Sequence, residues 1–334
     1  MKRCFALPIA MLACLTLAIA LFPSNAAAHQ APAASGSVTT QGPPLFEQEE
    51  GFVTTPGGAR IHYVSTATSV RVGTCGAHCM YHIMPMNLPP NLLFIPGWTM
   101  PAWIWEKQLE HFSSWRRAVA IDPRSQGESS KETEGHYPAA RARDIKAVID
   151  HLKLAPVVLV GWSMGVTEIA AYVDQFGTQG LAGVVLVDGI AGGDFDPNVT
   201  PRMYQFAASF QIDRPKTTAA FVRSMFRKPQ TGEYLQRLTD ASLATPTNSA
   251  VALFLGTFTA DYRPALGKID KPTLILAAGD DKTNPWMAKY RDMQQRIPGA
   301  RLEQFPDCGH ALFLDDPARF NSLLAQFLST LDVR

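Results

Sequence analysis

The 334-residue sequence has almost no net charge and no concentrated basic stretch. Lys and Arg number 30 and Asp and Glu 29, a formal net charge of +1 at pH 7. Attraction to nucleic-acid phosphates requires clustered cations, so the composition argues against a nucleic-acid partner. A hydrophobic share of 46% is typical of a globular protein with a sizeable core.

Cysteine is also scarce, with five in the chain. Cys75 and Cys79 lie in the stretch CGAHCMYH, which also contains His78 and His82. On a straight strand the two cysteines would be roughly 13 Å apart, too far for a disulfide, but Gly76 permits a turn. A disulfide and free thiols both stay open. On a helix the two cysteines and two histidines would share a face and could hold a small metal site. Gly76 and the strand-like surroundings argue against a helix, so a metal site is the least favoured alternative.

The N-terminus has the features of an export signal. Two basic residues precede an apolar stretch at 4–22, and small residues follow at 26–28. We predict a signal peptide at 1–28, a disordered leader at 29–44 and an exported protein, periplasmic or secreted, with no stable membrane insertion after cleavage. An uncleaved membrane anchor is the alternative, because the apolar run is long enough to span a bilayer.

From residue 45 onward, apolar strand-like runs alternate with amphipathic helical segments. Such alternation predicts an α/β fold with a doubly wound, mostly parallel sheet. One block, at about 192–266, is instead predicted to be helical and rich in aromatic residues. Because it follows a strand end, it is predicted to form an inserted helical cap over the functional edge of the sheet, with some aromatics lining an apolar pocket.

The most informative stretch is VVLVGWSMG at 157–165, where a buried strand enters Gly-x-Ser-x-Gly before a helical segment. Glycines on both sides of Ser163 permit a sharp strand–turn–helix that exposes its hydroxyl. The pattern predicts a nucleophile, and a serine N-cap in an ordinary turn is the alternative.

Acidic and basic partners follow further along the chain. Asp281 comes after a predicted buried strand, and His310 lies between the last strand and the last helix. A serine hydroxyl needs an imidazole to take its proton, and the imidazolium needs an anion behind it. The sequence therefore predicts a Ser163–His310–Asp281 triad.

Together these motifs resemble the α/β-hydrolase superfamily over residues 45–334, apart from the region around Cys75. The resemblance is carried by four segments of the sequence: GWSMG at 161–165, DPRSQGES at 122–129, IPGW at 95–98, and DCGH at 307–310 with Asp-Pro at 316–317. It implies hydrolysis of a small-molecule carboxylic ester through an acyl-enzyme, without a metal or organic cofactor. The alternatives are a perhydrolase, a lactone, amide or C–C hydrolase, and a non-catalytic binding protein with the same fold.

The resemblance also assigns the remaining site residues. The backbone N–H groups of Trp98 and Met164 would hold the oxyanion, although Pro96 replaces the family's usual histidine. Asp281 is the preferred acid because it lies four residues before a proline. Asp280 is the alternative when counted from Gly279, and Asp188, at the end of the preceding strand, is the third candidate.

Overall fold

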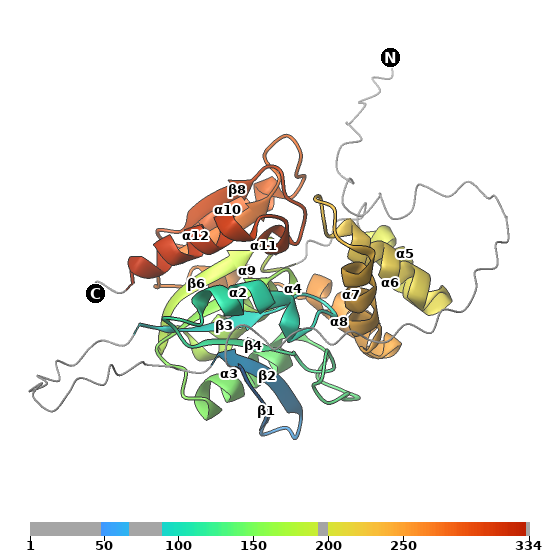
Figure 1. The fold of residues 1–334 in the computed structure, drawn as a ribbon, viewed down its shortest axis with the longest axis horizontal. Helices are drawn as coiled ribbons and strands as arrows, with labels where there is room; N and C mark the ends of the chain where they lie inside the picture. The colour runs from blue at the N-terminus through green and yellow to red at the C-terminus, as the bar shows by residue number, and fades with distance from the viewer. Residues whose placement is uncertain (1–47, 67–88, 193–199, 332–334) are drawn as a thin grey trace, which may run out of the picture.

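The computed structural model describes residues 48–66, 89–192 and 200–331 (Figure 1). The predicted signal peptide and leader and the Cys75–Cys79 pair lie outside the described residues.

The centre of the fold is an eight-stranded sheet in the order β1-β2-β4-β3-β5-β6-β7-β8. The first two strands pair antiparallel to each other and to β4, and the remaining neighbours are parallel. This sheet confirms the predicted α/β class. The strands are β1 (Gln48–Thr54), β2 (Arg60–Thr66), β3 (Asn91–Ile95), β4 (Ala118–Ile121), β5 (Val157–Trp162), β6 (Leu181–Val187), β7 (Thr273–Ala278) and β8 (Arg301–Phe305).

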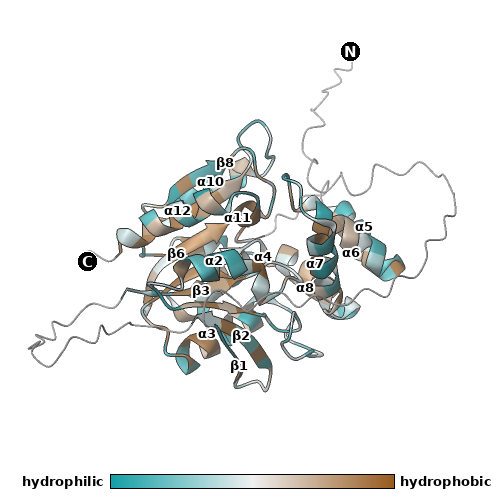
Figure 2. Cartoon of the chain, viewed as in Figure 1, coloured by the Kyte–Doolittle hydropathy of each residue, from teal (hydrophilic) through white to brown (hydrophobic). Residues whose placement is uncertain are grey.

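Helices cover both faces of the sheet because its strands are apolar on both sides. In β5, Val157 and Leu159 belong to one buried cluster, whereas Val158 and Val160 belong to the other. The helices α3 (Pro138–His151), α4 (Met164–Phe176) and α10 (Met287–Arg296) supply residues to the first cluster. The elements η1 (Ala102–Trp105), α2 (Glu106–Phe112), α11 (Leu312–Asp315) and α12 (Pro317–Ser329) supply the second. Figure 2 shows the apolar colouring of β6 and the largely hydrophilic colouring of α2. None of the helices in the described ranges combines the length and apolarity needed to cross a membrane.

Between β6 and β7 the chain forms a helical insertion, which we define as α5–α8. Its helices group to one side of the sheet in Figure 1, and α9 (Arg263–Leu266) then leads back to β7. Buried side chains of the insertion pack against Trp98 and Met164. The insertion therefore sits against the loops that follow β3 and β5. Its helices are α5 (Thr200–Ile212), α6 (Arg214–Ser224), α7 (Gly232–Leu243) and α8 (Thr247–Thr259).

Candidate active site

Ser163 occupies the sharp turn between β5 and α4, with a φ of 57°. A Cβ on Gly161 would lie 2.6 Å from the carbonyl oxygen of Gly165, and a Cβ on Gly165 would lie 2.7 Å from that of Ile95. Neither contact is tolerable, so both glycines are required for the turn. The serine is thereby held in a left-handed backbone conformation that is unusual for a residue with a side chain.

His310 lies between β8 and α11 and faces the serine. Its Nε2 is 2.9 Å from Ser163 Oγ. The Trp162 indole donates a hydrogen bond to the His310 carbonyl at 2.9 Å and packs against the imidazole ring at 5.1 Å between centroids. The histidine is therefore fixed from β5, the strand that leads to Ser163.

The carboxylate that reaches His310 is Asp188, directly after β6. Its Oδ2 is 2.7 Å from His310 Nδ1. Its Oδ1 accepts hydrogen bonds from Ala278 N at 2.8 Å and from the Tyr290 hydroxyl at 2.9 Å. Asp188 is 7% exposed, and its φ of 41° directs the chain away from β6. Three donors thus fix this carboxylate behind the imidazole.

The expected placement of Asp281 at the histidine is wrong. Its side chain is 57% exposed and forms an ion pair with Arg291 at 2.6 Å. The hydrogen bond from the Arg291 guanidinium lowers the pKa of Asp281. Both interactions hold the carboxylate at the surface of the β7 loop.

The carboxylate of Asp280, the alternative acid, is hydrogen-bonded within its own turn. Its Oδ1 accepts hydrogen bonds from the backbone N–H groups of Lys282 and Thr283, each at 3.0 Å. The Thr283 hydroxyl and these backbone donors lower the pKa of Asp280. The turn itself therefore uses this carboxylate.

Trp98 lies on the loop after β3, next to the serine. A Cβ on Gly97 would lie 3.0 Å from Ser163 Cβ, so glycine lets this loop approach the serine. Within the described ranges, neither the Trp98 nor the Met164 backbone N–H has a hydrogen-bond acceptor. Both expected oxyanion donors are thus backbone N–H groups that the described part of the fold does not use for its own hydrogen bonds.

The same loop is joined to the helical insertion through its side chains. The Trp98 indole donates to the Ala250 carbonyl at 2.7 Å and meets the rings of Phe210 and Phe221 edge-on. The Thr99 hydroxyl lies 2.7 Å from that of Ser242. The insertion and the loop beside Ser163 therefore share one packed interface.

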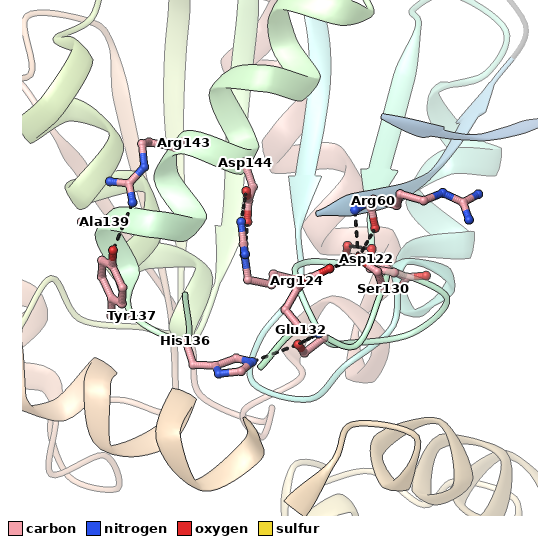
Figure 3. A network of polar contacts seen from close by, with 12 residues as sticks. Arg60, Asp122, Arg124, Ser130, Glu132, His136, Tyr137, Ala139, Arg143 and Asp144 are labelled. Atoms are coloured by element: carbon pink, nitrogen blue, oxygen red, sulfur yellow. Dashed lines mark hydrogen bonds and ion pairs between the residues drawn. The ribbon is translucent and has the colours of Figure 1, made fainter. Parts of the chain in front are cut away.

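The loop after β4 is held by charged side chains. The Arg124 guanidinium donates to both oxygens of Asp144, at 2.8 and 2.7 Å (Figure 3). His62 contacts Asp122 at 2.8 Å. Burial lowers the pKa of His62, but the hydrogen bond and charge of Asp122 outweigh it and raise the pKa above its usual value. The contact with Asp144 ties this loop to α3, and the contact of Asp122 ties it to β2.

No group of three or more His, Cys, Asp or Glu side chains in the described ranges is arranged to hold a metal ion. Cys308 is a buried free thiol whose pKa burial raises to about 11.

Comparison with known proteins identifies the family. A family model of the alpha/beta hydrolase fold matches residues 90–317. The chain belongs to this family. It is thus a hydrolase of the α/β fold.

Three similar proteins illustrate the relationship. The AB hydrolase superfamily protein YisY of Bacillus subtilis (strain 168) is 29% identical over 253 residues, covering 71% of this chain and 90% of the relative. A bifunctional esterase/perhydrolase DCH of Acinetobacter calcoaceticus is 24% identical over 266 residues, covering 72% and 91%. The solved structure of an esterase (EaEST) from Exiguobacterium antarcticum has a TM-score of 0.72 and 22% identity, covering 83% of this chain and 98% of that one.

Proposed function

We propose that this protein is an exported serine hydrolase that cleaves carboxylic esters through an acyl-enzyme. The observation that carries the proposal is the position of His310, which is 2.9 Å from Ser163 Oγ and 2.7 Å from Asp188 Oδ2. A base within hydrogen-bond reach of both a hydroxyl and an orienting carboxylate is the requirement for activating a serine.

In the first half-reaction, Ser163 Oγ attacks the ester carbonyl carbon while its proton passes to His310 Nε2. Asp188 accepts a hydrogen bond from Nδ1–H and stabilises the imidazolium that forms. The N–H groups of Trp98 and Met164 donate to the negative oxygen of the tetrahedral intermediate. Collapse of the intermediate expels the alcohol, which takes its proton from His310 and leaves the acyl group on Ser163.

In the second half-reaction, water attacks the acyl-enzyme. His310 accepts the proton of the water as its oxygen bonds to the acyl carbon, and then returns that proton to Ser163 Oγ as the carboxylic acid leaves. His310 carries every proton transfer in this scheme, while the two backbone N–H groups donate hydrogen bonds to the oxyanion.

Labelling with a fluorophosphonate tests the proposal, because the reagent reacts with activated serines. We expect wild-type protein to be labelled at Ser163 and to hydrolyse p-nitrophenyl esters. Ser163→Ala should lose both properties, while Ser224→Ala, at an exposed serine of α6, should retain them. Absence of label on folded wild-type protein would favour a non-catalytic binding protein with this fold.

The apolar cluster beside Trp98 favours an ester with an apolar acyl group. The cluster includes Phe206, Phe210 and Phe254 of the helical insertion. A series of p-nitrophenyl esters of increasing acyl length measures this preference. A kcat/KM that does not rise above that of the acetate ester would contradict it.

Perhydrolysis is the second candidate, and the similarity to the bifunctional esterase/perhydrolase DCH favours it. Hydrogen peroxide would replace water as the group that attacks the acyl-enzyme, giving a peracid in place of the acid. Measuring peracid and acid from one ester at increasing peroxide concentration separates the two activities.

Export is proposed from residues 1–28 alone. N-terminal sequencing of the protein recovered from the periplasm or medium of a bacterial host should give a chain that begins at His29. A membrane fraction that retains Met1 would support the anchor instead.

A further inference from the structure

The backbone of the loop that carries Trp98 is hydrogen-bonded by the buried side chain of Gln126, which lies in the loop after β4. Its Oε1 accepts a hydrogen bond from Thr99 N at 3.0 Å, and its Nε2 donates to the carbonyls of Gly97 and Met100 at 3.0 and 2.9 Å. Gln126 is 0% exposed. These bonds grip the loop on both sides of Trp98.

The loop requires such support because of its backbone. Thr99 has a φ of 58°, a left-handed conformation that costs free energy for a residue with a branched side chain. The surrounding contacts must determine a conformation of this kind for it to persist. The amide of Gln126 bonds the backbone of Thr99 directly, so it is one of the groups that hold this conformation.

Arg141, on α3, connects Gln126 to the helix that begins after the nucleophile. Its Nη1 and Nη2 lie 3.3 Å from Gln126 Oε1. Its Nη1 also lies 3.7 Å from the sulfur of Met164, and its Nε lies 2.8 Å from a carboxylate oxygen of Glu168. A single guanidinium therefore touches the support of the Trp98 loop and the first turns of α4.

Both charges of this pair are removed from solvent. Arg141 is 1% exposed and Glu168 0%. Burial raises the pKa of Glu168 to about 7, and the charge of Arg141 opposes that rise. The neighbouring Asp144 is already bound through both oxygens to Arg124 (Figure 3). Burying an ion pair seldom stabilises a fold more than apolar residues would. The contacts of Arg141 with Gln126 and with the Met164 side chain instead point to a role in the site.

We propose that Gln126 and Arg141 are positioning residues that fix the Trp98 and Met164 N–H groups relative to each other, with Glu168 holding Arg141 in place. The inference rests on the proposed ester hydrolysis. The two donors come from separate loops, after β3 and after β5, and a misplacement of about 1 Å at such a site can cost on the order of 10²-fold in rate.

The first test removes the hydrogen bonds that the Gln126 side chain makes to the loop. Gln126→Ala should lower kcat for a p-nitrophenyl ester by roughly 10- to 100-fold and leave KM within about twofold, because the lost interaction strengthens only as the oxyanion forms. Asn91→Ala is the matched control: Asn91 starts β3, at the opposite end of the strand that leads to the Trp98 loop, and donates to the Leu154 carbonyl at 2.7 Å. It should keep wild-type kcat.

The second test keeps the positive charge at position 141 but removes the planar guanidinium group, which can donate to several acceptors at once. Arg141→Lys retains a cation for Glu168 but cannot bridge to Gln126 in the same way. We expect kcat to fall about tenfold, with a smaller loss of Tm than in Arg141→Ala. Arg116→Lys is the control. Arg116 is also buried, and it donates to the Pro90 carbonyl just before β3, at the opposite end of that strand from the Trp98 loop.

Inhibition by a trifluoromethyl ketone supplies a readout that a purely structural role would not move. Its adduct with Ser163 carries the oxyanion, so its Ki should rise by the same factor by which kcat falls in Gln126→Ala and Arg141→Lys. If one variant does not fold, the other decides the matter.

The outcomes separate the inference from the function on which it rests. Wild-type protein without ester hydrolysis and without fluorophosphonate label would overturn the proposed function. Active wild type with unchanged kcat and Ki in both variants, an equal loss in the controls, or a rise in KM alone would overturn only the positioning role.

Discussion

Carboxylates follow both β6 and β7, which are neighbours in the sheet, but the one that contacts His310 is the residue after β6. Asp188 directly follows its strand and is fixed by Ala278 N and the Tyr290 hydroxyl. Asp281 lies beyond a turn closed by Asp280 and pairs with Arg291 at the surface. The two strand ends are neighbours in the sheet. The comparison therefore shows that the donors around a buried carboxylate, and not the strand that carries it, decide which one contacts His310.

Exchanging the carboxylates for amides tests this comparison most directly. Asp188→Asn should lower kcat by on the order of 10⁴-fold. The amide oxygen would stay with Ala278 N and the Tyr290 hydroxyl, so the amide NH2 would face His310 Nδ1, favour the wrong tautomer and supply no negative charge. Asp281→Asn and Asp280→Asn should stay within about twofold of wild type. Steady-state kinetics on a p-nitrophenyl ester measures all three, and a large loss in Asp281→Asn with an active Asp188→Asn would reverse the assignment.

Removing one donor from Asp188 sharpens the comparison. Tyr290→Phe deletes the hydroxyl that donates to Oδ1 and leaves the Ala278 N–H in place. We expect kcat to fall roughly tenfold, the scale of one hydrogen bond to a charged group, with KM unchanged. An unchanged kcat would mean that Ala278 N alone fixes the carboxylate.

Glu168 extends the comparison to a carboxylate that is buried against a cation. Burial raises its pKa from the usual value of 4.5 to about 7, although Arg141 opposes the rise and Asp144 adds to it. Between those pH values Glu168 is protonated in the folded protein but ionised in the unfolded chain. The contribution of this group to the free energy of unfolding therefore falls as pH rises from about 4.5 to 7. Glu168→Gln should remove that slope in urea denaturation at pH 5 and pH 8. An unchanged slope would assign it to other groups.

The smallest effect is expected at the surface pair of the β7 loop. Arg291→Gln leaves Asp281 without its ion-pair partner in a solvated position. Tm should fall slightly at low salt and match wild type in 0.5 M salt, because exposed pairs are screened. A fall in kcat would show that the β7 loop affects the site after all.

Much of this molecule was predictable from short segments of sequence. The parallel sheet follows from apolar runs of strand length, and the turn at Ser163 follows from Gly161 and Gly165, because close contacts forbid a Cβ at either position. His310 faces the serine as its place between the last strand and the last helix predicted.

The acid was harder to predict because chain order does not distinguish two adjacent strand ends. A signal was present in Gly189, which follows Asp188. A Cβ there would lie 2.2 Å from the Ser163 carbonyl oxygen, so the chain after β6 must pass directly beside Ser163. The role inferred for Gln126 was not visible at all, since Thr99 and Arg141 lie on either side of it in sequence and meet it only in the folded protein.

Trp98 has a consequence for building chimaeras of this protein. By connectivity it belongs to the sheet, but its indole is hydrogen-bonded to Ala250 and packed among the rings of the helical insertion. The insertion is therefore not an interchangeable module. A graft that replaced α5–α8 without the loop from Gly97 to Met100 would leave the Trp98 ring without its packing partners. The backbone of that loop lies beside Ser163, so the graft would also disturb the site.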